Sequence, residues 1–95
     1  MIHFGHPLEK LVAEALTRAN IKWIHEPPLP HTLRRIDFYL PDYNVYIEVK
    51  SFYSGKRIHE QLSNVQNSIL IVGYKAVEAF ICLITKEKVT IEPQL

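Results

Sequence analysis

The chain has 95 residues, the length of one domain, and 47% of them are hydrophobic and 22% charged. Its formal net charge of +1 argues against the strongly basic field of many nucleic-acid-binding proteins, although a local basic stripe is compatible with it. No run approaches the ~20 consecutive apolar residues of a membrane helix, and the N-terminus lacks a signal-peptide pattern. The single cysteine, Cys82, lies in an apolar run and predicts a buried thiol. We therefore expect one cytoplasmic domain spanning residues 1–95.

The N-terminal half predicts a helix followed by three strands. Apolar residues recur at helical spacing from Pro7 to Asn20, and a proline suits the first turn of a helix. A short strand is expected over Ile21–Glu26. Leu33–Leu40 alternates apolar and polar residues, as does Val45–Lys50. The turn residues of Pro41–Asn44 should join these two strands as an antiparallel hairpin.

The C-terminal half predicts a second helix, a buried strand and further short elements. Lys56–Asn67 is the expected helix, and Ile69–Gly73 is the apolar, β-branched run expected of a strand covered on both faces. A short helix over Lys75–Glu78, a strand over Ala79–Ile84 and an edge strand over Val89–Glu92 should follow. The order α-β-β-β-α-β-α-β with a terminal strand predicts a mixed sheet with helices packed on it, of the α/β or α+β class.

Asp37, Glu48 and Lys50 form the constellation with the clearest chemical meaning. Glu48 and Lys50 are two residues apart on a strand, so their side chains should leave the same face. The expected hairpin would bring Asp37 close to Glu48. Two converging carboxylates suit a hard divalent cation, and a neighbouring lysine can orient a water or stabilise charge on a phosphate. A solvated strand face with a cross-strand ion pair is the competing interpretation.

The segments Arg34–Pro41 and Tyr46–Ser51 carry a resemblance to a known family. An Asp at the start of an apolar strand, a turn, and a second apolar strand ending in Glu-x-Lys resemble the PD-(D/E)XK nuclease superfamily. The resemblance implies a restriction-endonuclease-like core, with a mixed sheet of about four to five strands flanked by helices in the order α-β-β-β-α-β. Ile36 stands where the motif has proline, a common departure in this family.

The resemblance also implies roles for individual residues. Asp37 and Glu48 would bind Mg²⁺ or Mn²⁺, with the carbonyl oxygen of Val49 as an additional ligand, and Lys50 would be catalytic. Members of the family use a further acid on the first helix. Glu9 lies on the border of the apolar face of that helix whereas Glu14 points away from it, so Glu9 is the candidate. A solvated acid stabilised by the helix dipole is the alternative for Glu9.

Several polar residues are candidates for the periphery of this site. The family often places a glutamine or a basic residue on its second helix, and Gln61 is the candidate there, as a further catalytic residue. Arg34, Arg35, Lys56 and Arg57 flank the expected site and are candidates for phosphate contacts in nucleic-acid binding, against the alternative of surface solubility. His25, His31 and His59 show no metal-ligand spacing.

Two functions compete at this level. The first is a Mg²⁺- or Mn²⁺-dependent DNA endonuclease acting as a homodimer, because 95 residues are a thin scaffold for cutting two strands. Its substrate stays open between junctions, nicking sites and plain duplex DNA, and RNA is not excluded. The second is a catalytically silent nuclease fold that binds a nucleic acid or a protein. The intact Asp37, Glu48 and Lys50 favour the enzyme, and the near-neutral charge favours the binding module.

Overall fold

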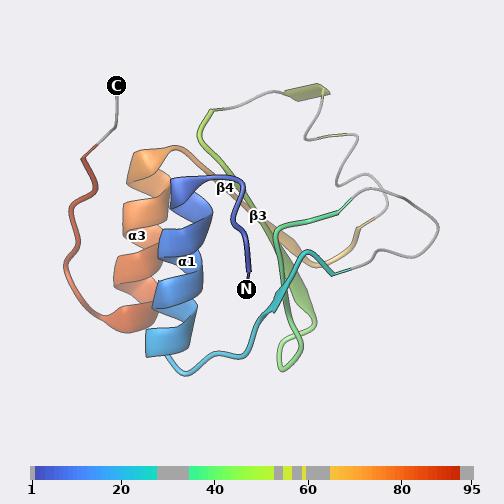
Figure 1. Ribbon diagram of the computed structural model, residues 1–95, viewed down its shortest axis with the longest axis horizontal. Helices are drawn as coiled ribbons and strands as arrows, with labels where there is room; N and C mark the ends of the chain where they lie inside the picture. The colour runs from blue at the N-terminus through green and yellow to red at the C-terminus, as the bar shows by residue number, and fades with distance from the viewer. Residues whose placement is uncertain (1, 28–34, 53–54, 57–58, 60–64, 93–95) are drawn as a thin grey trace.

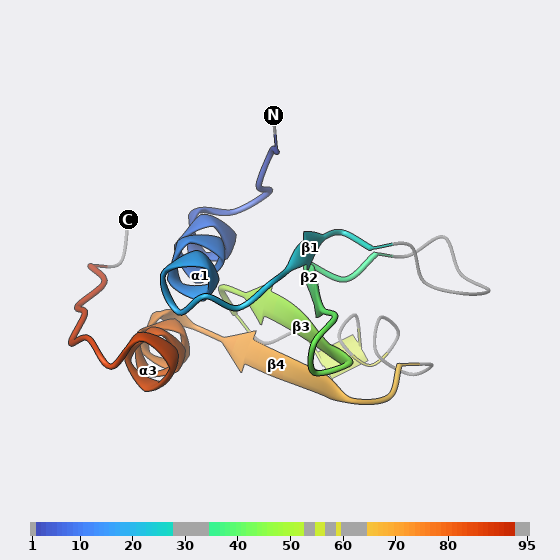
Figure 2. The same cartoon turned by 90° about the horizontal axis from the view of Figure 1, so that it is seen from below.

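The computed structural model describes residues 2–27, 35–52, 55–56, 59 and 65–92. It has a four-stranded mixed sheet in the order β1-β2-β3-β4, with α1 and α3 side by side against it (Figures 1 and 2). The first three strands are antiparallel neighbours, and β4 runs parallel to β3. None of the helices in the described ranges is long and apolar enough to cross a membrane. The elements are α1 (Pro7–Arg18), β1 (Ile24–His25), β2 (Phe38–Leu40), β3 (Val45–Lys50), β4 (Ser68–Val72) and α3 (Tyr74–Thr85).

Helix α1 begins and ends where its sequence allows. His6 caps it, with its Nδ1 accepting a hydrogen bond from the backbone N–H of Leu8 at 3.0 Å, and Pro7 takes the first helical position. Ala19 ends the helix, and Asn20 follows in the left-handed conformation with φ of 60°. The helix buries one face, which includes Leu8, Val12 and Leu16 at intervals of one turn. This face packs on the sheet, as its spacing predicted.

The predicted hairpin is confirmed. The N–H of Tyr43 donates to the carbonyl of Leu40 at 3.2 Å, and Asn44 takes a positive φ of 53° to complete the turn. Phe38 then lies opposite Ile47 in the β2–β3 pair, and both are fully buried. Because side chains alternate along a strand, this register turns Glu48 to the opposite face of β3 from Ile47.

The first two strands are shorter than their sequences predicted. Only Ile24–His25 of the expected strand 21–26 pairs with β2, and Glu26 leaves the strand with φ of 47°. The strand expected over 33–40 begins at Phe38, because the chain bends at Asp37; residues 33 and 34 lie outside the described part. The N–H of Glu26 still donates to the carbonyl of Asp37 at 2.9 Å. This contact keeps the end of β1 beside Asp37.

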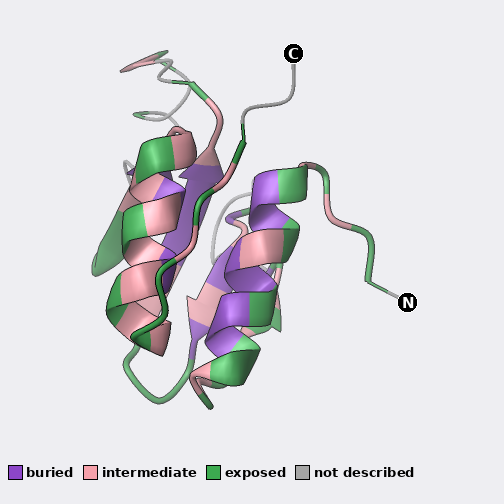
Figure 3. Cartoon of the chain, turned by 90° about the vertical axis from the view of Figure 1, so that its left-hand side faces the viewer, coloured by how far each residue is buried: buried purple, intermediate pink, exposed green. Residues whose placement is uncertain are grey.

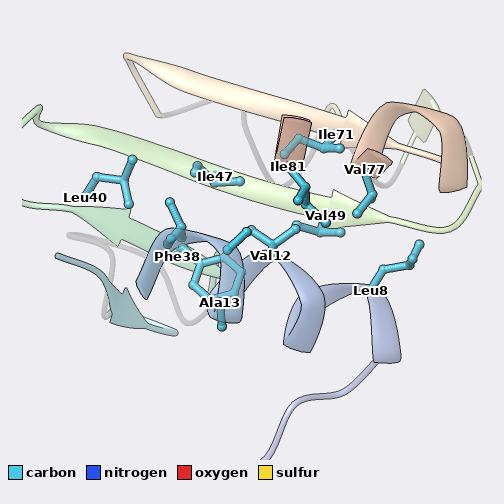
Figure 4. Packing of buried hydrophobic residues seen from close by; sticks show 12 residues of the cluster. Leu8, Val12, Ala13, Phe38, Leu40, Ile47, Val49, Ile71, Val77 and Ile81 are labelled. Atoms are coloured by element: carbon cyan, nitrogen blue, oxygen red, sulfur yellow. The ribbon is translucent and has the colours of Figure 1, made fainter. Parts of the chain in front are cut away.

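The core lies between the sheet and the two helices. Ile47 and Val49 of β3 and Ile71 of β4 face α1 and α3, and Figure 4 shows their side chains converging with those of the helices. The predicted strand over 69–73 is confirmed, one residue earlier at each end, but the expectation that both its faces are covered is wrong: β4 is an edge strand, and Ile69 is 41% exposed. The helix expected over 56–67 falls mostly outside the described residues. Residues 55, 56 and 59 are helical, but residues 65–67 are not, so the expected end of the helix is wrong.

The prediction of a short helix followed by a strand over 75–84 is wrong. Tyr74–Thr85 is one continuous helix of 12 residues. An unbroken apolar run does not distinguish a buried strand from a buried helix. Here the segment is helical because a helix places Val77 and Ile81 on the same face against the core, where each is at most 1% exposed. Cys82 lies on this helix and is half-buried rather than buried.

The predicted edge strand over 89–92 is also wrong. These residues form no strand; the segment runs back over the helices, as Figure 3 shows. The N–H of Ile91 donates to Oε2 of Glu78 at 2.8 Å, and Val89 and Ile91 pack against the core. That backbone hydrogen bond also holds the pKa of the Glu78 carboxyl below its usual range. Apolar contacts with α3 thus replace the expected sheet pairing.

Gly73 joins β4 to α3 in a conformation that favours glycine. Its φ is 92° and its ψ 162°, and an added Cβ would have no atom within 4 Å. Gly73→Ala is therefore expected to destabilise the fold by about 1–3 kcal/mol through backbone strain alone. Urea unfolding measures this cost. Gly5→Ala is the matched control, since its Cβ would only touch a side-chain oxygen at 3.8 Å; equal stability of both variants would contradict the prediction.

Candidate active site

The candidate site forms where β2 and β3 separate. Asp37 precedes β2 and lies close to Glu48 of β3. The N–H of Asp37 donates to Oε1 of Glu48 at 3.1 Å, and the N–H of Val49 donates to Oδ2 of Asp37 at 2.7 Å. Side-chain oxygens thus accept the hydrogen bonds of backbone groups at the point where the chain bends. The predicted proximity of Asp37 and Glu48 is confirmed, and both carboxyl groups are anchored.

Lys50 shares the side of β3 on which Glu48 lies. Its Nζ is 3.3 Å from Oε2 of Glu48, as expected for residues two apart on a strand. The side chain of Glu48 is 1% exposed and that of Lys50 is 34% exposed. The carboxylate is therefore enclosed while the ammonium reaches solvent. This burial contradicts the interpretation of the pair as a solvated strand face.

Glu9 joins the two carboxyl groups from α1. It is 8% exposed, whereas Glu14 is exposed, so the choice between the two acids is confirmed. Its carboxyl hydrogen-bonds with that of Asp37 and with the backbone of Gly5. Glu9 is therefore not a solvated acid at the start of a helix. Three acids from α1, β3 and the residue before β2 meet in one buried cluster.

Burial raises the pKa of all three acids. The pKa of Glu48 rises from 4.5 to about 7, first through desolvation and then through the neighbouring charge of Asp37, with Lys50 opposing the shift. Desolvation also raises the pKa of Asp37 from 3.8 to about 6, against the stabilising hydrogen bond from Val49. The pKa of Glu9 is raised, again chiefly by desolvation. Among the described residues, the single ammonium of Lys50 does not balance three carboxylates, so full ionisation is unfavourable.

His25 is a member of this cluster that the sequence did not single out. Its Nε2 lies 3.5 Å from Oε2 of Glu9, and both side chains are 10% exposed. The imidazole packs edge-on against the ring of Phe4, with centroids 4.8 Å apart, and lies 5.8 Å from the ring of Phe38. Its position follows from the pairing of β1 with β2, which sets His25 opposite Phe38. No ligand-like spacing in the sequence signals this arrangement.

The oxygen and nitrogen atoms of these side chains are of the type that binds a divalent cation. No group of three or more His, Cys, Asp and Glu side chains in the described ranges is already arranged around a metal position. However, among the described residues Oε2 of Glu9 is buried without a hydrogen-bond partner, and Oε2 of Glu48 has only the ammonium of Lys50 beside it, at 3.3 Å. Buried carboxylate oxygens with few or no donors are what a hard divalent cation would satisfy.

The peripheral candidates are only partly described. Arg35 is 67% exposed on its side chain and lies 3.6 Å from Oε2 of Glu26, at the entrance to the bend that carries Asp37. Lys56 is exposed. Val49, the predicted carbonyl ligand, adjoins the site through its N–H. Three further candidates, Gln61, Arg34 and Arg57, lie outside the described residues.

Comparisons with protein-family models, with curated proteins and with solved structures found no match. The functional argument for this α/β fold therefore depends on the chemistry of its own site. That site combines two buried acids, a half-buried one, a lysine and an imidazole. Such a group can bind a divalent cation, hold or release protons near neutral pH, and present a positive charge to an anionic substrate.

Proposed function

We propose that this protein is a metal-dependent DNA endonuclease with a PD-(D/E)XK-type site on a restriction-endonuclease-like core. The observation that carries the proposal is the meeting of the buried Glu9 and Glu48 with the half-buried Asp37 beside Lys50. The order helix, three strands, a crossing segment and a parallel strand agrees with the core that the sequence resemblance implies.

The energetics of the cluster favour a site over a structural ion pair. Burying a carboxylate without full pairing costs free energy, and three such groups share one ammonium. A structural role would be served better by apolar side chains of similar volume. A silent binding module has no need for the buried acids, whereas an active site commonly accepts such a loss of stability. This comparison supports the enzyme over the binding module.

Each residue of the cluster has a distinct role in the proposed enzyme. Asp37, Glu48 and Glu9 would hold Mg²⁺ or Mn²⁺, with the carbonyl of Val49 as a further oxygen donor. The bound ion would lower the pKa of a coordinated water and neutralise charge on the phosphodiester. The hydrogen bonds from Asp37 N–H and Val49 N–H keep two of the carboxyl groups oriented. The ammonium of Lys50 would contact the phosphate or the attacking water.

The surface that binds the substrate would consist of charged and polar residues around the metal site. Arg34, Arg35, Lys56 and Arg57 are the proposed phosphate contacts, and Gln61 a proposed catalytic residue from the segment that crosses from β3 to β4. With a net charge of +1, binding to an undistorted duplex would be weak, which favours a branched or nicked target. We also propose a homodimer, for which light scattering after size exclusion is the direct measurement.

The test is cleavage of supercoiled plasmid and of a synthetic four-way junction with Mg²⁺, Mn²⁺ or EDTA. Wild-type protein is expected to cut at least one substrate with a metal and neither with EDTA. Asp37→Asn should abolish cutting, because the amide retains the size of the side chain but loses its charge. Asp42→Asn, in the exposed hairpin turn, is the matched control and should cut normally.

Two results would contradict the proposal. One is the absence of cutting of both substrates by folded wild-type protein with either ion. The other is cutting by Asp37→Asn at the wild-type rate, which would point to a contaminating nuclease. Binding of the junction without cutting would instead support the binding module.

A further inference from the structure

We infer that Nε2 of His25 is a nitrogen ligand for the cation of this site, beside Oε2 of Glu9, and that the site consequently prefers Mn²⁺ to Mg²⁺. This inference depends on the proposed function, since it assigns a further ligand and an ion preference to the same centre. It uses an imidazole for which the sequence indicated no role.

The distance between His25 and Glu9 suits two ligands of one ion. The N–O separation is 3.5 Å, whereas a charge-assisted hydrogen bond between such groups closes to about 2.7–2.9 Å. Two donor atoms that each lie about 2.1–2.2 Å from a shared octahedral ion at 90° are roughly 3.0–3.1 Å apart, so a shift of a few tenths of an ångström would make the two groups neighbouring ligands. Both atoms are buried, and neither has a hydrogen-bond partner in the described part of the chain. A cation between them would satisfy both.

The surroundings hold the two groups in this relation. Phe4 and Phe38 enclose the imidazole ring, so it has apolar neighbours on the sides that face them. Gly5 lies against Oε1 of Glu9, with 3.8 Å from that oxygen to the position of an added Cβ. The other oxygen, Oε2, is consequently the one directed at His25. The N-terminal segment and β1 thus position a nitrogen and an oxygen donor next to Asp37.

A nitrogen donor changes which ions the site should prefer. Mg²⁺ demands near-ideal octahedral geometry, is usually bound through carboxylates and phosphates, and gives up its waters reluctantly. Imidazole binds first-row transition ions, and Mn²⁺, although it is the weakest binder of that series, gains more from a nitrogen donor than Mg²⁺, which keeps to oxygen ligands. The carboxylates alone would bind both ions. His25 adds affinity for Mn²⁺ with little gain for Mg²⁺.

The test is calorimetric titration of the protein with MnCl₂ and with MgCl₂, without DNA. We expect His25→Ala to weaken Mn²⁺ binding at least about tenfold and to change Mg²⁺ binding much less. His25→Gln, which keeps a polar side chain of similar length, should behave in the same way. His3→Ala removes an exposed histidine and is the matched control. In wild-type protein, substoichiometric Mn²⁺ should broaden the imidazole NMR signals of His25 ahead of those of His3.

The outcomes separate the inference from the proposed function. If wild type binds both ions and the His25 variants keep its Mn²⁺ to Mg²⁺ affinity ratio, the inference is overturned while the metal-dependent enzyme stands. If wild type binds neither ion at millimolar concentration, both proposals fail. If His25→Ala does not fold, the NMR measurement decides: signals of His25 that stay sharp with Mn²⁺ bound would overturn the ligand assignment.

Discussion

Replacing Lys50 by alanine is expected to reduce metal-dependent DNA cleavage by about 10²–10⁴-fold, the usual range for loss of a positioned acid–base or charge-stabilising group. The side chain of Lys50 is 34% exposed, yet its Nζ lies 3.3 Å from the buried carboxylate of Glu48, so it links the cluster to the solvent side where a phosphate would approach. Single-turnover cleavage of the preferred substrate, at saturating metal, measures the effect on the chemical step.

Lys75→Ala is the matched control for this variant. Lys75 also pairs with a glutamate, at 3.4 Å from Oε1 of Glu78, but it is 87% exposed and lies on α3 away from the cluster. The Lys75→Ala variant should cleave DNA at the wild-type rate. Metal affinity should be retained in Lys50→Ala, since loss of the ammonium removes a competing positive charge. Cleavage by Lys50→Ala within a few-fold of wild type would exclude a direct role for this lysine.

Glu48→Gln is expected to make the fold more stable above neutral pH. The pKa of Glu48 is raised from 4.5 to about 7 in the folded protein, so between these values the folded state binds more protons than the unfolded state. Stability therefore falls as the pH rises through this window, by on the order of 3 kcal/mol for this group. Asp37, with its pKa raised from 3.8 to about 6, adds to the fall in the same direction. The glutamine removes the contribution of Glu48.

Thermal unfolding at pH 5 and pH 8 measures this effect. Wild type should lose stability between the two values, and Glu48→Gln should lose less, with a Tm at pH 8 higher than that of wild type by about 12–24 °C. Glu14→Gln, at an exposed position of α1, should follow the wild-type curve. A divalent cation should stabilise wild type at pH 8 more than Glu48→Gln. If Glu48→Gln is less stable than wild type at pH 8, the prediction is contradicted and the carboxylate of Glu48 is needed for the fold.

The local chemistry of the chain was enough to predict the hairpin and the first acids of the site. The turn residues after Leu40 and the alternation on either side determine the register, and the register puts Glu48 and Lys50 on one side of β3. The helical spacing from Pro7 separated Glu9 from Glu14 in the same way. These predictions depend on neighbours within one or two elements, where periodicity is informative.

Elements that depend on distant partners were predicted poorly. The run Ala79–Ile84 is apolar throughout, and its helical form follows from packing of Val77 and Ile81 against α1 and the sheet. The segment after Lys86 was expected to extend the sheet, but Glu78 and the surface of α3 hold it. In both cases a choice between secondary structures was made by burial against residues far away in the sequence.

The sequence by itself determined which groups the site contains: Asp37, Glu48 and Lys50 on a hairpin, with Glu9 on the inner border of the first helix. Only the tertiary structure decided that Glu9 and Glu48 are buried next to Asp37, since desolvation depends on how α1 packs over the end of β3. The same is true of His25, which reaches Glu9 because β1 pairs with β2 across a long connection. Spacing along a strand is a local property, whereas burial and the meeting of separate elements are properties of the whole fold.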